Sequence, residues 1–309
     1  EGVSRVAKKA PTPASDALSR ESHAEMIRRE RRSNDALHKL CRNKTAVAGF
    51  LVICIMVIFA VFAPWIATHD PYALSMANSK LPPGVDGHIF GTDELGRDLF
   101  SRIVYGSRVS ISVAQGGTIL GGILGSILGM IAGYNGKWVD SVIMRIMDGM
   151  FAFPFILLSI FLMTIFGDGL FNVILAIGIA DIPKFARTVR GQVVMLKNEE
   201  YCAVEQVLGA SGFRILVHHI MPNAISPIIV YGTLNIASAI LAESALGFLG
   251  LGVITPTPSW GNILRAGKDV MNTAPHIASI SGGFIMITVL AFNLFGDGVR
   301  DVLDPKMKK

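Results

Sequence analysis

The chain has 309 residues, of which 51% are hydrophobic and 17% are charged, and its net charge is +5. Soluble domains carry about 25% charged residues, so this composition argues against an ordinary soluble enzyme and predicts a membrane protein with several spans. The three cysteines form no C-x-x-C pair and no histidine cluster has metal-ligand spacing, so no metal site is expected. The modest positive charge indicates membrane topology and no nucleic-acid binding.

Long stretches without charged residues predict five membrane-spanning helices. They are residues 45–68, 109–136, 149–167, 220–242 and 270–296, each long enough to cross a hydrocarbon core of about 30 Å.

A sixth span is predicted to start at residue 169, where 12 uncharged residues precede Asp181. So short an apolar helix cannot cross a membrane alone. We therefore expect this span to continue past Asp181 and Lys184, with that end at the cytoplasmic interface or facing the protein interior. The sequence thus predicts an all-α membrane protein with six transmembrane helices.

Basic residues predict the orientation. With the N-terminal arm inside, the inner segments hold 22 Lys and Arg and the outer segments hold five, so both termini are expected to be cytoplasmic. The expected parts are a cytoplasmic arm (1–44), a first transmembrane helix (45–68), an extracytoplasmic segment (69–106), a five-helix transmembrane domain (107–297) and a cytoplasmic tail (298–309). The arm is expected to bind membrane lipid headgroups; a specific partner is the less favoured alternative.

Five glycines recur every four residues in the second predicted span. Residues at this spacing share one helix face, and glycines there let another backbone approach closely. Helix packing is the favoured interpretation, and a smooth wall of a translocation path is the alternative. The glycines are Gly117, Gly121, Gly125, Gly129 and Gly133.

The motifs of common catalytic sites are missing from the sequence. It contains no Walker-type phosphate loop, no H-E-x-x-H and no Ser-His-Asp arrangement, so no catalytic residue is proposed. Glu243 is the clear candidate for a buried ionisable group, near the end of the fifth span. It could coordinate an ion, line a path or reach the interface; an interface position or a hydrogen bond to nearby backbone is favoured.

A polar segment, "EEYCAVEQVLGASGFRILVHHIMPNA" (199–224), lies between the fourth and fifth spans on the predicted cytoplasmic side. It predicts a helix, a turn and a second helix. Asn198 is the expected N-cap, Glu200 suits the helix dipole, Gly209 supplies the turn and Pro222 marks re-entry into the membrane. A short amphipathic helix without its own core is expected to dock into a partner's groove; the alternative is a helix lying on lipid.

This segment resembles the "EAA" coupling loop of the permease subunits of bacterial ATP-binding-cassette importers. In that family a glycine follows the Glu-Ala-Ala triplet by four residues and a proline follows later. Gly209 and Pro222 hold those places, whereas the triplet itself is altered to Ala-Val-Glu. The resemblance implies that the loop 197–222 couples the chain to ATPases. The implied residues are Glu200, Tyr201, Ala203, Val204, Glu205, Leu208, Gly209, Ala210, Ser211 and Pro222.

Other stretches resemble the second permease of dipeptide, oligopeptide and nickel importers. They are "FGTDELGRDLFSRIVYGSRVSISV", "ALGFLGLG", "PTPSWGNIL" and "LAFNLFGDGVRDVLDPK", and the likeness runs from about Lys39 to the end. It implies a type I importer permease fold in the bacterial plasma (inner) membrane, forming half of a pore for peptide uptake.

The implied partners are a homologous second permease, two ATPase subunits that bind ATP and Mg, and an extracytoplasmic solute-binding protein. The chain itself would be non-catalytic and hold no cofactor. Nickel or another small solute is the alternative cargo. A secondary transporter, which would need ionisable groups near the bilayer midplane, and a structural or receptor-like membrane protein are the alternatives from other classes.

Overall fold

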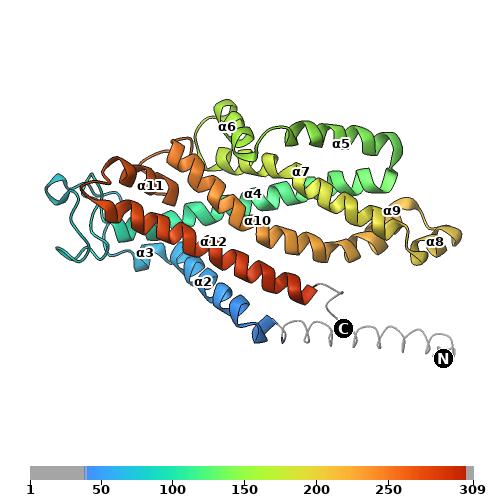
Figure 1. The fold of residues 1–309 in the computed structure, drawn as a ribbon, viewed down its shortest axis with the longest axis horizontal. Helices are drawn as coiled ribbons and strands as arrows, with labels where there is room; N and C mark the ends of the chain where they lie inside the picture. Colours follow the sequence, from blue (N-terminus) through green and yellow to red (C-terminus); the bar gives the residue numbers. More distant parts are fainter. Residues whose placement is uncertain (1–37, 39, 304–309) are drawn as a thin grey trace, which may run out of the picture.

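The computed structural model describes residues 38 and 40–303, and these residues form helices and no β-strand (Figure 1). Two isolated β-bridges lie in the segment 67–98. The helices are α2 (Lys44–Val61), α3 (Ala63–Ile66), η1 (Met76–Asn78), α4 (Leu99–Asn135), α5 (Lys137–Phe151), α6 (Phe155–Phe166), α7 (Leu170–Lys197), α8 (Glu200–Val207), α9 (Gly212–Ile215), η2 (Leu216–Ile220), α10 (Met221–Leu249), α11 (Trp260–Asp269) and α12 (Pro275–Leu303).

The long helices form an elongated bundle (Figure 1). Helix α4 packs most extensively against α7, and α10 contacts both of them; α12 packs against α10 and α2. The segment 67–98 and α11 lie at one end of the bundle, and α8 and α9 lie at the other. The predicted arm 1–44 and the last residues of the tail fall mostly outside the described residues.

Four helical stretches of the described chain are long and apolar enough to cross a membrane: α2, α4, the continuous stretch Gly212–Leu249 and α12. The pair α5 and α6 counts as a fifth if it is one broken span. Helix α7 does not meet this criterion by composition, because charged residues interrupt its second half. The all-α prediction is confirmed for the described residues.

The third predicted span, 149–167, is not a straight helix. The axes of α5 and α6 differ by 91° across a short break. Pro154 precedes α6, and proline lacks an amide hydrogen and disfavours the helical conformation of the residue before it. The prediction of one continuous helix here is therefore wrong.

The second predicted span starts earlier than expected. Helix α4 begins at Leu99 rather than at residue 109, so its first turns lie inside the predicted extracytoplasmic segment 69–106. Arg102 is buried in these turns, 3.2 Å from the Asp93 carboxylate, and it donates to the Pro71 carbonyl oxygen at 3.1 Å. Because Arg102 is neutralised in this way, the helix continues through it. The prediction began the span only after the last charged residue, and it therefore placed the start of the helix too late.

Helix α11 was not predicted, because its ten residues are too few for a span. Trp260 at its start is fully buried and donates its indole N–H to the Ile103 carbonyl oxygen of α4 at 3.1 Å. The Ser281 hydroxyl of α12 donates to the Trp260 carbonyl oxygen at 2.6 Å. These bonds join α11 to two long helices at the end of the bundle.

Helix α7 continues past Asp181 and Lys184 as one helix, as expected. Asp181 is fully buried; it accepts from Lys184 at 2.8 Å and from the Asn235 side-chain amide of α10 at 2.7 Å. The two predicted alternatives for this part of α7 were the cytoplasmic interface and the protein interior, and Asp181 faces the interior. Buried charges need such partners, because an isolated one is costly.

Candidate functional site

The predicted helix–turn–helix is present at one end of the bundle. Helix α8 begins after Glu199, which is its N-cap residue; Asn198 instead ends α7, so that capping prediction is wrong. Gly209 makes the turn with φ of +84°, in the left-handed region that favours glycine. Ser211 then caps α9 by accepting from the Arg214 amide at 3.4 Å.

The ten predicted coupling residues all belong to this element and its exit. Glu200, Tyr201, Ala203, Val204 and Glu205 lie on α8; Leu208, Gly209, Ala210 and Ser211 form the turn; Pro222 is the second residue of α10. The structure thus places all ten on one continuous segment of the chain.

One side of the loop is anchored to the bundle. Cys202 of α8 is buried with Val189 and Val193 of α7, and with Ile215 and Ile220. Its thiol donates to the Leu196 carbonyl oxygen at 3.4 Å. Burial raises the pKa of the Cys202 thiol above its ordinary value. Helix α8 is therefore held against the end of α7 by apolar packing.

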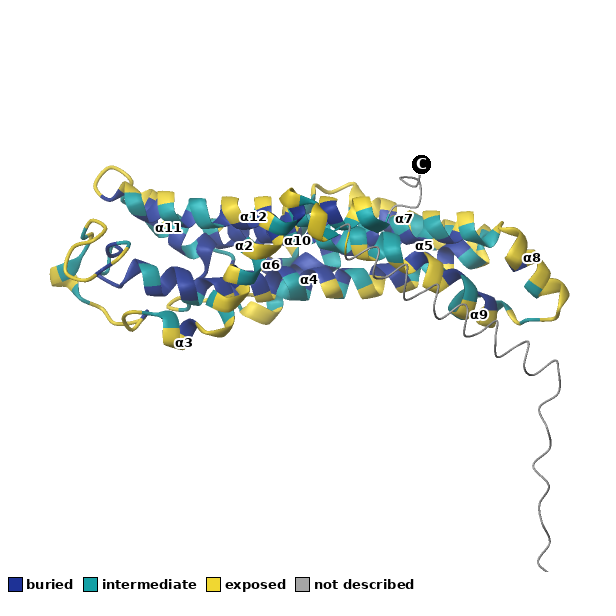
Figure 2. Ribbon diagram, turned by 90° about the horizontal axis from the view of Figure 1, so that it is seen from below, coloured by how far each residue is buried: buried dark blue, intermediate teal, exposed yellow. Residues whose placement is uncertain are grey.

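Most residues of α8 and of the turn that follows it are exposed (Figure 2), and several of them are large and apolar. Val207 is 88% exposed, Leu208 and Phe213 are 76% exposed, and Val204 is 57% exposed. Several exposed apolar residues on one short helix–turn–helix are typical of a contact surface. We call Val204, Val207, Leu208 and Phe213 the apolar tip.

The tip is flanked by polar groups. Glu205 and His219 approach each other at 3.6 Å, and both are about one-third exposed. Pairs of this exposure contribute little to stability. They place polar groups beside the apolar tip, an arrangement common to protein contact surfaces.

The glycine face of α4 lies against α7. A Cβ atom at Gly121 would be 2.7 Å from the Gly178 carbonyl oxygen, and one at Gly129 would be 2.5 Å from the Ala186 carbonyl oxygen. A Cβ atom at Gly117, Gly125 or Gly133 would likewise be 2.6–2.9 Å from its nearest neighbour, which in each case belongs to α7. The five glycines thus allow two backbones to touch, and α7 fills the face on which they lie.

Glu243 is fully buried, so its side chain does not reach the surface of the described chain. The Ser244 hydroxyl donates to its Oε2 at 3.4 Å. Oε1 has no hydrogen-bond partner within the described chain.

Several polar contacts between distant segments were missed in the sequence. Arg190 of α7 makes a two-bond ion pair with Asp140 of α5, which fastens the amphipathic α5 to the bundle. His69, His88 and Asp98 converge at the opposite end, although they are far apart in the sequence. No local spacing signals either contact, because both depend on the tertiary fold.

Together these features define a helical membrane protein with several spans and one ordered helix–turn–helix at the end of its bundle. Residues 125–309 match the family described as "Binding-protein-dependent transport system inner membrane component". Residues 32–83 match the "N-terminal TM domain of oligopeptide transport permease C". The chain belongs to this family of inner-membrane transport components, and the resemblance seen in its motifs is confirmed.

Named relatives cover almost the whole chain. The chain is 44% identical over 277 residues to the dipeptide transport system permease protein DppC of Alkalihalophilus pseudofirmus, covering 89% of this chain and 90% of the relative. It is 40% identical over 275 residues to the oligopeptide transport system permease protein OppC of Bacillus subtilis, with the same coverage. It is 42% identical over 268 residues to the glutathione transport system permease protein GsiD of Escherichia coli, covering 86% of this chain and 88% of the relative.

Proposed function

We propose that this chain forms half of the pore of an ATP-driven importer of small peptides. Relatives named for dipeptide, oligopeptide and glutathione transport are 40–44% identical to it over 86–89% of its length. Peptides are the chemistry these three names share, which favours peptide over nickel as cargo.

The proposed assembly contains a homologous second permease, two ATPase subunits and an extracytoplasmic solute-binding protein. ATP and Mg are bound by the ATPases, and this chain catalyses no reaction. Its six spans are α2, α4, the broken pair α5 and α6, α7, α10 and α12, with both termini in the cytoplasm. The internal pairing of Asp181 supports counting α7 as a span, because the buried charge is partnered within the protein.

The apolar tip carries the coupling part of the proposal. Burying a Val, Leu or Phe side chain contributes about 1.5–3 kcal/mol, so Val207, Leu208 and Phe213 can hold a partner strongly once a groove covers them. Helix α8 is at the same time fixed to α7 through Cys202. A displacement of the ATPase is therefore passed from the tip to a long helix of the bundle.

Charged substitutions at the tip test this role. Val207→Asp and Leu208→Asp leave the isolated chain folded, because both side chains are largely exposed, but place a charge in the proposed contact. Met271→Asp is the matched control, since Met271 is also an exposed apolar residue (52%) but lies next to α11, at the other end of the bundle.

The assay reconstitutes each variant with its partners in liposomes and measures ATPase binding, ATP hydrolysis and uptake of a labelled dipeptide. The tip variants are expected to lose ATPase binding, or to hydrolyse ATP without uptake, while the control binds normally. Normal coupled uptake by both tip variants would refute the coupling role. Coupled uptake of nickel but of no peptide would instead refute the proposed cargo.

A further inference from the structure

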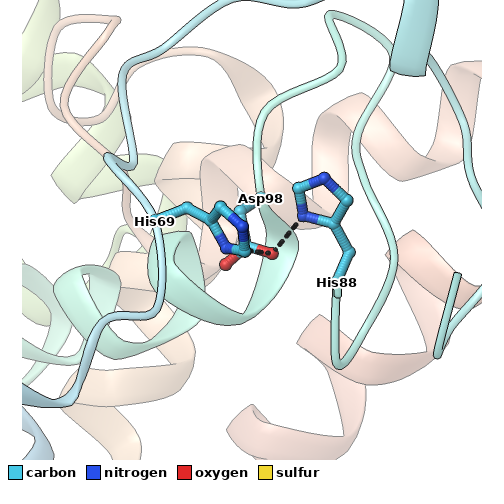
Figure 3. A group of neighbouring side chains, drawn as sticks. All are labelled: His69, His88 and Asp98. Atoms are coloured by element: carbon cyan, nitrogen blue, oxygen red, sulfur yellow. Dashed lines mark hydrogen bonds and ion pairs between the residues drawn. The ribbon is translucent and has the colours of Figure 1, made fainter. Parts of the chain in front are cut away.

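Three metal-ligating side chains converge at the end of the bundle opposite the apolar tip. His69 and His88 come from the segment 67–98, and Asp98 is the residue before α4 (Figure 3). One ligand atom from each lies within 4.8 Å of the other two. None of the three is used in the proposed coupling to ATPases.

The two oxygens of Asp98 have different surroundings. Oδ2 accepts from the Ser101 amide at 2.8 Å and from the Thr68 hydroxyl at 3.2 Å. Oδ1 faces the two histidines, 2.8 Å from His88 Nδ1 and 3.7 Å from His69 Nδ1. The carboxylate is thus oriented by outer hydrogen bonds while one oxygen points at the imidazoles, which is the usual arrangement around a metal-binding carboxylate.

The spacing suits a small divalent ion. Tetrahedral Zn²⁺ with bonds of about 2.0–2.1 Å separates its ligand atoms by roughly 3.3 Å. Asp98 Oδ1 is 2.8 Å from His88 Nδ1 and 3.7 Å from His69 Nδ1, and these two distances lie on either side of this value. The His69 side chain is 41% exposed, so it can make the small adjustment that closes the site.

The ligand types select the class of metal. Imidazole nitrogens favour zinc and its neighbours among the transition metals, whereas Mg²⁺ and Ca²⁺ prefer sites made wholly of oxygen. The Asp98 side chain is fully buried and that of His88 is 9% exposed, while His69 opens toward solvent. An ion can therefore enter past His69, with a water completing its coordination.

We propose that His69, His88 and Asp98 form a binding site for one divalent transition-metal ion of the Zn²⁺ type. The ion takes the place of the proton between His88 Nδ1 and Asp98 Oδ1, and that proton leaves to solvent. Because the ligands come from the segment 67–98 and from the start of α4, the bound ion ties that segment to the bundle.

The test measures zinc binding to the full chain, purified with a histidine-free affinity tag and stripped with a chelator. Titration against a chromophoric zinc chelator is expected to give one Zn²⁺ per chain, with a Kd tighter than about 10 µM. His69→Gln and His88→Gln are each expected to weaken binding by about tenfold or more. His276→Gln is the matched control, because His276 is a half-buried histidine near Gly91 and Thr92 that lies outside the cluster.

A thermal melt of each protein, with Zn²⁺ or Mg²⁺ added, separates a metal site from a simple hydrogen-bonded contact. Zn²⁺ should raise the Tm of the wild type and of His276→Gln, but not that of the cluster variants, and Mg²⁺ should change none of them. The exposed position of His69 keeps its variant folded. The proposal is overturned if the wild type binds no stoichiometric zinc, or if His69→Gln and His88→Gln bind it as the wild type does.

Discussion

Gly125 is one of the positions where the contact between α4 and α7 leaves no room for a side chain. A Cβ atom there would lie 2.6 Å from the Ile182 carbonyl oxygen, 2.6 Å from Phe185 Cβ and 3.0 Å from the Ala186 amide nitrogen. Ordinary contacts of this kind begin at 3.4 Å. Gly125→Ala therefore requires α7 to move away by about 0.8 Å locally.

Two opposing contributions set the change in the free energy of unfolding caused by Gly125→Ala. Overpacking of a tight interior costs about 1–3 kcal/mol, and the separation also loosens the neighbouring contacts of Gly121 and Gly129. Alanine in place of glycine favours a helix by about 0.8–1.0 kcal/mol. These terms leave a net loss in the free energy of unfolding of roughly 0–2 kcal/mol for Gly125→Ala. We expect a larger loss for Gly125→Leu, with poor recovery of the assembled complex.

Gly122 provides the matched control on the same helix. A Cβ atom there meets only the Phe185 ring, at 3.4 Å or more, so Gly122→Ala is expected to be neutral or slightly stabilising. The measurement is the Tm of each purified protein in the same detergent, together with the yield of intact complex after extraction. Equal Tm values and yields for Gly125→Ala and Gly122→Ala would refute the packing argument.

Three further predictions concern single residues. Gly209→Arg should leave the chain inserted but give weak ATPase binding or hydrolysis without uptake in liposomes, because φ of +84° suits glycine; tight coupling would contradict this. Cys202, buried and with a raised thiol pKa, should react with maleimide far more slowly at pH 7.5 than the exposed Cys41; equal rates would mean that α8 is not anchored. Glu243→Gln should retain ATP-dependent uptake, because the amide oxygen can still accept from the Ser244 hydroxyl; lost uptake with normal assembly and ATPase activity would indicate a role in the path.

Local features of the sequence were enough to predict part of this structure. Gly209 and the short apolar pattern around it predicted a helix–turn–helix, because a left-handed turn and a capped helix depend on neighbouring residues. The repeat from Gly117 to Gly133 likewise predicted a close-packed face, since the i, i+4 spacing alone puts glycines on one side of a helix.

Features that depend on distant partners could not be predicted in this way. Charge spacing cannot reveal that Arg102 is neutralised by Asp93, or that Asp181 is met by Asn235 of another helix. The length of an uncharged stretch also does not show whether its helix is straight. The change of axis between α5 and α6 was therefore not predicted, because residues 149–167 are long enough for one span.

The seam between α4 and α7 also has a mechanical consequence. Because backbone meets backbone at every fourth residue of α4, the two helices are expected to turn together as one stiff rod rather than slide past each other. From Asp181 to Lys197 this rod is about 24 Å long at 1.5 Å per residue. A tilt of about 10° around Asp181 thus moves the α8 end by roughly 4 Å. In such a tilt the contact of α7 with α10 at Asp181 and Asn235 would be the pivot, and a small change of angle there would become a few ångströms of displacement at the apolar tip.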